Sequence, residues 1–181
     1  MQSLINEQKT SCFNSGDEIP NTSEHIWLIV NGVVKTFTIS ESGTLITLGF
    51  WGEQDLIGQP LSCIEPYFLK CMSNVQLSMI PRSQWSNCSR DFFYHGQQTQ
   101  QLLFIIRNTR IAKRLWLLLQ WLSSKFGRVV EQGTIIDFQL THQELADAIG
   151  TTRITVTKIL NQFEREGLIV RPKTKCIILK Q

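Results

Sequence analysis

The sequence predicts an α+β fold in two parts, a front half of short strands and a back half of helices that ends in two β runs. Apolar residues alternate at short range in the front half and recur at helical spacing from Gln97 onward. The charge also changes sign: five Lys and Arg stand against nine Asp and Glu through Ile106, and thirteen stand against six beyond it. An acidic front and a basic back favour two domains, the back one with a polyanionic partner. On charge alone, basic residues that only solvate helices remain an equal alternative.

Composition excludes several classes of protein. The 181 residues are enough for two small domains. The five cysteines are odd in number and scattered, without a C-x-x-C pair, which argues against a disulfide framework or a zinc site and favours a reducing compartment. The start MQSLINEQKT has no signal-peptide pattern. The apolar runs LLFII and LWLLL flank a basic segment, so we expect an intracellular protein with no membrane span.

The front half, residues 1–90, is predicted to form a sandwich or barrel of short strands. The stretch HIWLIVNGVVKTFTISESGTLITLGFWGEQDLIG alternates apolar positions, and Asn31-Gly32 and Ser42-Gly43 interrupt it as hairpin turn signals. The later stretch LKCMSNVQLSMI has the same β character.

Helical spacing predicts a connecting helix over residues 91–110, a hinge near Asn108 and a second helix that ends near Gly127. The second helix has an apolar stripe of Ile111, Leu115, Leu118, Leu119 and Leu122. The first has a stripe that includes Leu102, Ile105 and Ile106. Such a stripe is usually core of the same chain, but in a helix that joins two domains it can be a dimer seam. We expect these three residues to pack against their symmetry mates.

The stretch LTHQELADAIGTTRITVTKIL predicts two helices around Gly150. Thr141 with Glu144 fits a capping box at the first helix, and Thr151 or Thr152 can cap the second. The inward faces are then Leu145, Ala146 and Ile149 on the first helix and Val156, Ile159, Leu160 and Phe163 on the second. The outer face of the second helix carries Arg153, Ile154, Thr157, Lys158 and Asn161, which suit phosphate oxygens and base edges.

The end of the chain, LIVRPKTKCIILK, predicts a β-hairpin around a basic turn. Beside the two helices this hairpin would be a wing, with Arg171, Lys173 and Lys175 near a DNA backbone. Residues 111–181 are therefore predicted to form a winged helix-turn-helix, whose second helix enters the major groove. We count Thr141 and Thr152, at the helix starts, among the DNA contacts. The alternative is an ordinary helical hairpin with a solvated face.

These motifs resemble the Crp/Fnr winged-helix transcription regulators over nearly the whole chain. GDEIP, HIWLIVNGVVK and SGTLITLGFWGEQDLIGQPLS are similar to the family's N-terminal β-roll, a jelly roll of the cyclic-nucleotide-binding type. The recognition helix is similar to that of the global nitrogen regulators of cyanobacteria and plastids. The resemblance implies a homodimer in the cytoplasm or plastid stroma that binds palindromic double-stranded DNA, works with RNA polymerase and catalyses no reaction.

The resemblance also implies a DNA target. In much of the family an arginine, a glutamate and a second arginine read a TGTGA half-site, and the matching positions here are Arg153, Ile154 and Lys158. Ile154 has no acceptor for a cytosine amino group, but its methyl groups suit a thymine methyl. We expect a GTA-type half-site instead, as for the nitrogen regulators, with half-sites about one DNA turn apart.

The same resemblance predicts no cofactor but leaves the effector unidentified, with Arg107, Arg110 and Lys113 as the remaining basic groups for 2-oxoglutarate or, alternatively, as solvated helix charges. Members that bind cyclic AMP use a Glu after Ile-Gly and an Arg-Ser pair, whereas here Gln59 and Pro60 follow Ile57-Gly58 and LSCIEPYFLK contains no arginine. The nitrogen regulators bind 2-oxoglutarate with help from an arginine that aligns with Glu65 here, and a carboxylate would repel this dicarboxylate.

Two other classes fit parts of the sequence. A cupin-like metalloenzyme would need clustered histidines, but His25, His95 and His142 are isolated and no His-x-His occurs. A redox or iron–sulfur sensor on the same scaffold would need several thiolates near the N-terminus, where only Cys12 lies. We therefore predict no metal site and no catalytic residue.

Overall fold

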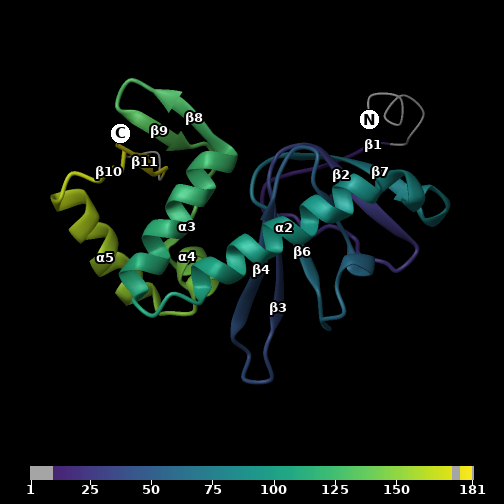
Figure 1. Cartoon of the computed structure of the whole chain (residues 1–181), viewed down its shortest axis with the longest axis horizontal. Helices are drawn as coiled ribbons and strands as arrows, with labels where there is room; N and C mark the ends of the chain where they lie inside the picture. The colour runs from purple at the N-terminus through teal and green to yellow at the C-terminus, as the bar shows by residue number, and fades with distance from the viewer. Residues whose placement is uncertain (1–9, 173–175, 181) are drawn as a thin grey trace. The chain divides into compact units, whose positions relative to one another are not determined.

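A computed structural model describes residues 10–172 and 176–180, and the chain divides into two compact units, residues 1–100 and 101–181 (Figure 1). The first unit is mainly strands and the second mainly helices, as the periodicity predicts. Helix α2 (Ser89–Ile106) contributes to both units. The predicted boundaries at residues 90 and 110 fall at the start of α2 and in the turn that follows it.

The first unit forms two antiparallel sheets that together make the expected β-roll. One sheet has the order β1 (Thr10–Phe13), β7 (Val75–Pro81), β2 (His25–Asn31) and β5 (Leu56–Ile57). The other has the order β4 (Leu45–Trp51), β3 (Val34–Ile39) and β6 (Phe68–Cys71).

Only one of the two predicted hairpin turns joins paired strands. Ser42-Gly43 lies between β3 and β4, which pair directly, and Gly43 has a positive φ of 79°. The prediction at Asn31-Gly32 is wrong, because β2 and β3 belong to different sheets. Gly32 instead carries the chain from one sheet to the other, with φ 95° and so little space that an added Cβ would lie 2.3 Å from the Asn74 carbonyl oxygen.

The apolar run in β2 arises because both faces of its sheet are covered. Trp27 and Ile29 point into a core cluster that contains residues of both sheets. Ile26 and Leu28 point the other way, into a cluster with residues of the 3-10 helix η2 (Arg82–Cys88) and the first turn of α2. Alternate residues of a strand face opposite sides, so a strand buried on both sides is apolar throughout.

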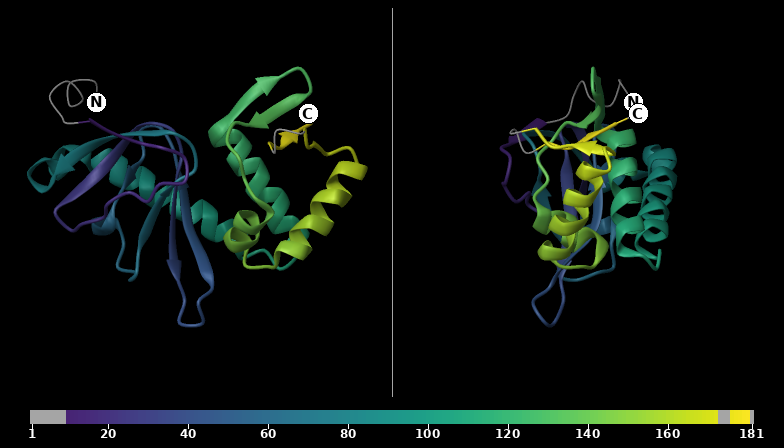
Figure 2. Two further views of the ribbon diagram at one scale, coloured as in Figure 1. Left: turned by 180° about the vertical axis from the view of Figure 1, so that it is seen from behind. Right: turned by 90° about the vertical axis from the view of Figure 1, so that its left-hand side faces the viewer.

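The second unit continues with helix α3 (Ile111–Phe126), whose stripe of Leu115, Leu118, Leu119 and Leu122 is fully buried as predicted. The sequence predicts no element between Gly127 and Leu140, but β8 (Gly127–Val130) and β9 (Gly133–Ile136) form a hairpin directly after α3 (Figure 2). Helices α4 (His142–Ile149) and α5 (Arg153–Arg165) follow, and then β10 (Ile169–Val170) and β11 (Ile178–Leu179). These strands form one sheet in the order β10, β11, β9, β8.

The hinge predicted near Asn108 is the turn between α2 and α3. The side-chain amide of Asn108 donates to the Phe104 backbone carbonyl at 2.9 Å, and this hydrogen bond caps the end of α2. The stripe expected to form a dimer seam is not open to a second copy, since Leu102 and Ile105 are each only 4% exposed in the single chain and Ile106 is half-buried. Helical spacing identified an apolar face, but the face is covered within the chain itself.

Candidate nucleic-acid interface

The first helix of the helix-turn-helix begins with the predicted capping box. The Thr141 hydroxyl accepts from the Glu144 amide at 3.1 Å, and the Glu144 carboxylate accepts from the Thr141 amide at 2.8 Å. Helix α4 ends at Gly150, whose left-handed φ of 66° turns the chain toward α5.

The second helix, α5, is held by the apolar face that the sequence predicts. Thr152 caps it by accepting from the Thr155 amide at 3.2 Å. Val156, Leu160 and Phe163 are buried, while Ile159 is only half-buried. The Phe163 ring packs edge-on against Trp116 of α3, with 5.5 Å between ring centroids. The burial of α4 and α5 against α3 leaves the opposite face of α5 to solvent.

Two cationic side chains on this outer face are free. Arg153 and Lys158 are exposed, and within residues 10–172 and 176–180 neither side chain makes a hydrogen bond or ion pair. Ile154 lies between them and is 69% exposed. A cation pair around an exposed apolar residue, at the start of a helix, can contact both phosphates and base edges.

Two other predicted contacts are already engaged with neighbouring elements. The Thr157 hydroxyl donates to the Arg153 carbonyl at 2.9 Å and lies 2.7 Å from Nδ1 of His142. The Asn161 side-chain oxygen accepts from Nη2 of Arg171 at 2.6 Å. The outer face of α5 is therefore divided between residues open to a ligand and residues bound to the protein.

The wing forms where the sequence predicts it. Strands β10 and β11 pair antiparallel, with Ile169 opposite Leu179 and Val170 opposite Ile178. Lys173 and Lys175, which are predicted to contact DNA phosphates, lie outside the described residues.

Arg171, at the start of the wing turn, makes contacts that the sequence did not reveal. Its Nε and Nη2 donate to Oε2 of Glu164, and its backbone amide donates to Oε1 at 3.3 Å. Hydrogen bonding to Arg171 holds the pKa of the Glu164 carboxyl below its ordinary value. Arg171 was expected near a DNA backbone, but here most of its donors are used by α5.

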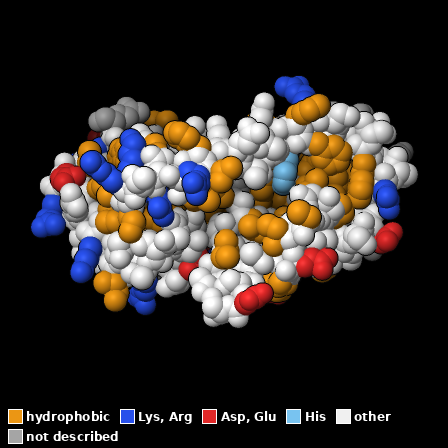
Figure 3. Space-filling view, turned by 60° about the horizontal axis from the view of Figure 1, so that its bottom comes forward, with side chains coloured by type: hydrophobic (Ala, Val, Ile, Leu, Met, Phe, Trp, Pro, Cys, Tyr) orange, Lys and Arg blue, Asp and Glu red, His pale blue; other side chains and the backbone are white. Residues whose placement is uncertain are grey.

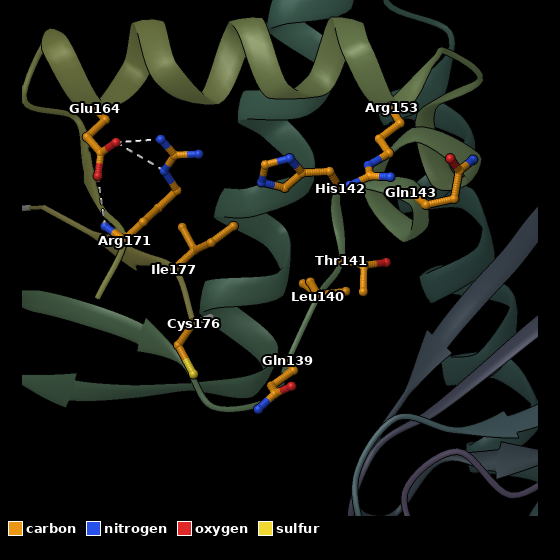
Figure 4. Close-up of a pocket in the computed structure, with 10 residues that line it drawn as sticks. All are labelled: Gln139, Leu140, Thr141, His142, Gln143, Arg153, Glu164, Arg171, Cys176 and Ile177. Atoms are coloured by element: carbon orange, nitrogen blue, oxygen red, sulfur yellow. Dashed lines mark hydrogen bonds and ion pairs between the residues drawn. The ribbon is translucent and has the colours of Figure 1, made fainter. Parts of the chain in front are cut away.

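An open pocket of about 760 Å³ lies between the start of α4, α5 and the wing. It is lined by Gln139, Leu140, Thr141, His142, Gln143, Arg153, Glu164, Arg171, Cys176 and Ile177. In Figure 4 the His142 ring lies between the side chains of Arg171 and Arg153, with Glu164 on the far side of Arg171. Burial, and then the charges of Arg171 and Arg153, lower the pKa of His142 below its ordinary value.

The sequence pattern missed His142 and Glu164 as parts of this site. His142 was considered only as a metal ligand, although its place directly after the capping Thr141 was a usable signal. Glu164 gave no signal, because its partner Arg171 lies seven residues later on a different element. On the face shown in Figure 3, Lys and Arg side chains gather mainly over the second unit, in agreement with the predicted charge division.

Comparison with known proteins agrees with this geometry. A family model described as a Crp-like helix-turn-helix domain matches residues 109–181. The Regulatory protein CysR of Synechococcus elongatus is 36% identical over 163 residues, which cover 88% of this chain and 79% of that protein. The chain belongs to the Crp/Fnr family of transcription regulators.

Other Crp/Fnr relatives match over most of their length. The Global nitrogen regulator of Synechococcus elongatus is 28% identical over 95% of this chain and 83% of its own. The crystal structure of a CRP-family transcriptional regulator from Thermus thermophilus superposes with a TM-score of 0.82 over 94% of this chain and 92% of that chain. Its sequence identity of 20% supports the shared fold alone.

The β-roll of this Crp/Fnr protein has a pocket of about 870 Å³ near the segment where the family's effector residues are expected. Glu18 and Glu65 line it, and its lining includes no Lys or Arg among the residues described. The backbone amide of Gln59 donates to Asn21 Oδ1 at 2.7 Å, and Asn21 Nδ2 donates to the Gln59 side-chain oxygen at 3.1 Å. The charge of this pocket is therefore opposite to that needed for an anionic effector.

Two further features of the described residues bear on the alternatives. Their five cysteines are free thiols, and no group of three or more His, Cys, Asp or Glu among them could hold a metal ion. No helix in the same part of the chain combines the length and apolar character needed to cross a membrane.

Proposed function

We propose that this regulator binds palindromic DNA with GTA-type half-sites as a two-fold dimer, in the manner of nitrogen-control regulators. The observation that carries the proposal is the exposed start of α5, where the Arg153 and Ile154 side chains make no hydrogen bond or ion pair within the described part of the chain. The arginine fork matches the O6 and N7 acceptors of guanine, and an exposed isoleucine gains most by packing on a thymine methyl.

The same two residues argue against a TGTGA half-site. Ile154 has no oxygen to accept from a cytosine amino group, and Lys158 offers a point charge where a second arginine fork would be needed. Selection from random duplex DNA tests this directly. We expect a palindrome with GTA half-sites, and enrichment of TGTGA half-sites would contradict the proposal.

The dimer seam is assigned to the exposed face of α2. Phe93 and Phe104 are 77% and 67% exposed. Together with the exposed Gln97 and Gln100 they recur at intervals of four, three and four residues, the spacing of a coiled-coil seam. Polar residues at such inner positions specify the register of two helices. This stripe replaces Leu102 and Ile105, which the chain itself buries.

A charge in the seam tests the dimer. Phe104→Glu is expected to convert the protein to monomers in sedimentation velocity and to weaken binding to a palindromic duplex. The matched control is Leu103→Glu, which also adds a charge at an exposed apolar site but points about 100° away around the helix. Monomers from the control but not from Phe104→Glu would place the seam elsewhere on α2.

We further propose that neither cyclic AMP nor 2-oxoglutarate is needed for DNA binding. Support comes from the carboxylates of Glu18 and Glu65 in the β-roll pocket, which disfavour an anionic ligand. RNA polymerase remains a proposed partner of the DNA complex. Footprinting on genomic DNA with and without 2-oxoglutarate is expected to give the same protected sites at the same protein concentration. Protection of DNA that requires either ligand would overturn the proposal that DNA binding needs neither.

A further inference from the structure

The pocket beside the recognition helix has the chemistry of an anion site. Of the residues that line it, Arg153 and Arg171 are cationic, and Glu164 is the single acidic one among the lining residues described. Glu164 is bound to Arg171 on the side away from His142 (Figure 4), so its charge is offset there. An anion placed beside His142 would lie next to the Arg171 guanidinium and in the field of Arg153, whose fork remains for the guanine base.

The start of α4 adds backbone donors to the same pocket. The first amides of a helix have no intrahelical acceptor. The capping box satisfies the Glu144 amide, but it leaves those of His142 and Gln143, which line the pocket, without an acceptor inside the helix. Helix N-termini attract phosphate groups through these amides and the helix dipole.

The hydrogen bonds of His142 determine which ring nitrogen is free to take a proton. With the Thr157 hydroxyl donating its one proton to the Arg153 carbonyl, Nδ1–H of His142 is assigned as the donor to that hydroxyl. The remaining nitrogen, Nε2, is then the unprotonated one in the neutral ring. A proton gained by His142 therefore goes to Nε2 and creates an N–H donor for an anion.

We propose that this pocket holds one backbone phosphate of bound DNA and that His142 takes up a proton at Nε2 as the phosphate enters. The inference rests on the proposed DNA binding and couples that binding to proton uptake by His142. In the free protein burial and then the charges of Arg171 and Arg153 disfavour the protonated ring. A phosphodiester beside the ring adds a negative charge that favours the imidazolium.

The charged and titratable groups that face His142 come from each neighbouring element. Helix α5 contributes Arg153 and Glu164, and the wing contributes Arg171 and the Cys176 thiol. On α4 itself, Glu144 is turned back to cap Thr141. The described groups around the ring thus favour its neutral form until an anion arrives, as the lowered pKa of His142 in the free protein indicates.

The sign of the pH dependence follows from linkage. A group whose pKa rises on binding takes up a proton, so binding is strongest below its free pKa and weakens as pH rises through the pKa of the complex. Burial, and then the charges of Arg171 and Arg153, lower the pKa of His142 in the free protein from its ordinary value. DNA affinity should therefore increase as pH falls from 8 toward 6, by at most about tenfold per pH unit for one proton.

The test compares the full chain with two variants on two duplexes. Binding is measured from pH 5.5 to 8 for the unmodified protein, His142→Gln and the control His25→Gln, which changes a histidine of the β-roll. One duplex has GTA half-sites one turn apart and the other a scrambled sequence of equal length. We expect a shallower pH dependence in His142→Gln alone, on both duplexes.

A second measurement follows His142 in the unmodified protein and does not depend on DNA binding by a variant. The His142 ring proton resonance, assigned by its loss in His142→Gln, is titrated with and without the GTA duplex, and we expect a higher pKa in the complex. An unshifted resonance in a protein that binds DNA would overturn the inference, as would equal pH dependence in His142→Gln and the unmodified protein. If the unmodified protein binds neither duplex at any pH, the proposed function itself fails.

Discussion

The two halves of α5 use the residues of their outer face differently. In the first half, Arg153, Ile154 and Lys158 are exposed and their side chains contact no partner among the described residues. In the second half, Asn161 and Glu164 both bind Arg171 of the wing. The first half is thus free to read DNA, whereas the second half fixes the wing to the helix.

This division shows that a solvent-facing position on a recognition helix is not by itself a DNA contact. The second half packs beside the wing, and its Asn161 and Glu164 side chains find a protein partner there. Base contacts by the start of the helix also agree with the usual geometry of helix-turn-helix proteins in the major groove. The predictions below test whether the halves differ in function as they do in contacts.

The largest effect is expected when the arginine of the first half is removed and compared with removal of an arginine in the second half. Arg153→Ala should weaken binding to a GTA palindrome by about 1–3 kcal/mol and relax preference at the guanine. Arg165→Ala is the matched control, because this exposed arginine of the second half donates to the Asn161 carbonyl of its own helix and to no other group among the described residues. Titration of each variant on specific and scrambled duplexes gives the loss of affinity and the loss of sequence preference. Equal loss of sequence preference in the two variants would show that the two halves of α5 do not differ in DNA reading.

A smaller effect is expected when Ile154 gains an acceptor. Ile154→Glu should accept from a cytosine amino group and shift preference toward TGTGA, by about 1 kcal/mol for one hydrogen bond. Ile154→Val keeps an apolar branched side chain and should retain GTA. Selection from random DNA reads out both variants. A Glu variant that still selects GTA would show that position 154 does not face the bases.

The wing lysines should act without sequence preference. Lys173→Ala and Lys175→Ala are each expected to weaken binding to specific and scrambled duplexes alike and to reduce the slope of log affinity against log salt by about one unit per lost phosphate contact. The expectation rests on the sequence, since both residues lie outside the described part of the chain. An unchanged slope in both variants would remove the wing turn from the interface.

Sequence predicted the features that depend on neighbours along one element. The capping box of Thr141 and Glu144 joins residues three apart, and its two hydrogen bonds form as expected. The buried Val156, Leu160 and Phe163 follow from helical spacing alone. The β-roll and the winged helix-turn-helix followed from such local patterns together with the family resemblance.

Features that depend on which distant surface covers a residue were not predictable in this way. The turn signal at Asn31-Gly32 marks a turn but does not say which sheet the next strand joins. The stripe with Leu102 and Ile105 shows an apolar face but not whether the same chain or a second copy covers it. The pairing of Glu164 with Arg171 depends on where the wing folds back, which no spacing in the sequence encodes.

The smallest expected effect tests the second half of α5 alone. Glu164→Gln removes the ion pair with Arg171 and should lower the free energy of unfolding at pH 7 by less than about 1 kcal/mol, because solvent screens the pair, whose Arg171 and Glu164 side chains are 23% and 40% exposed. The pKa of Glu164 is lowered from 4.5 in the folded state, so its contribution is present above that value and is lost as pH falls through the folded pKa. Urea unfolding should therefore show the two proteins converging below about pH 4. The control Glu166→Gln changes a glutamate of the same helix that accepts from the neutral Gln162 side chain, and so removes a carboxylate without an ion pair. A difference for Glu164→Gln that persists at pH 3 would mean that packing, and not the ion pair, joins the wing to the helix.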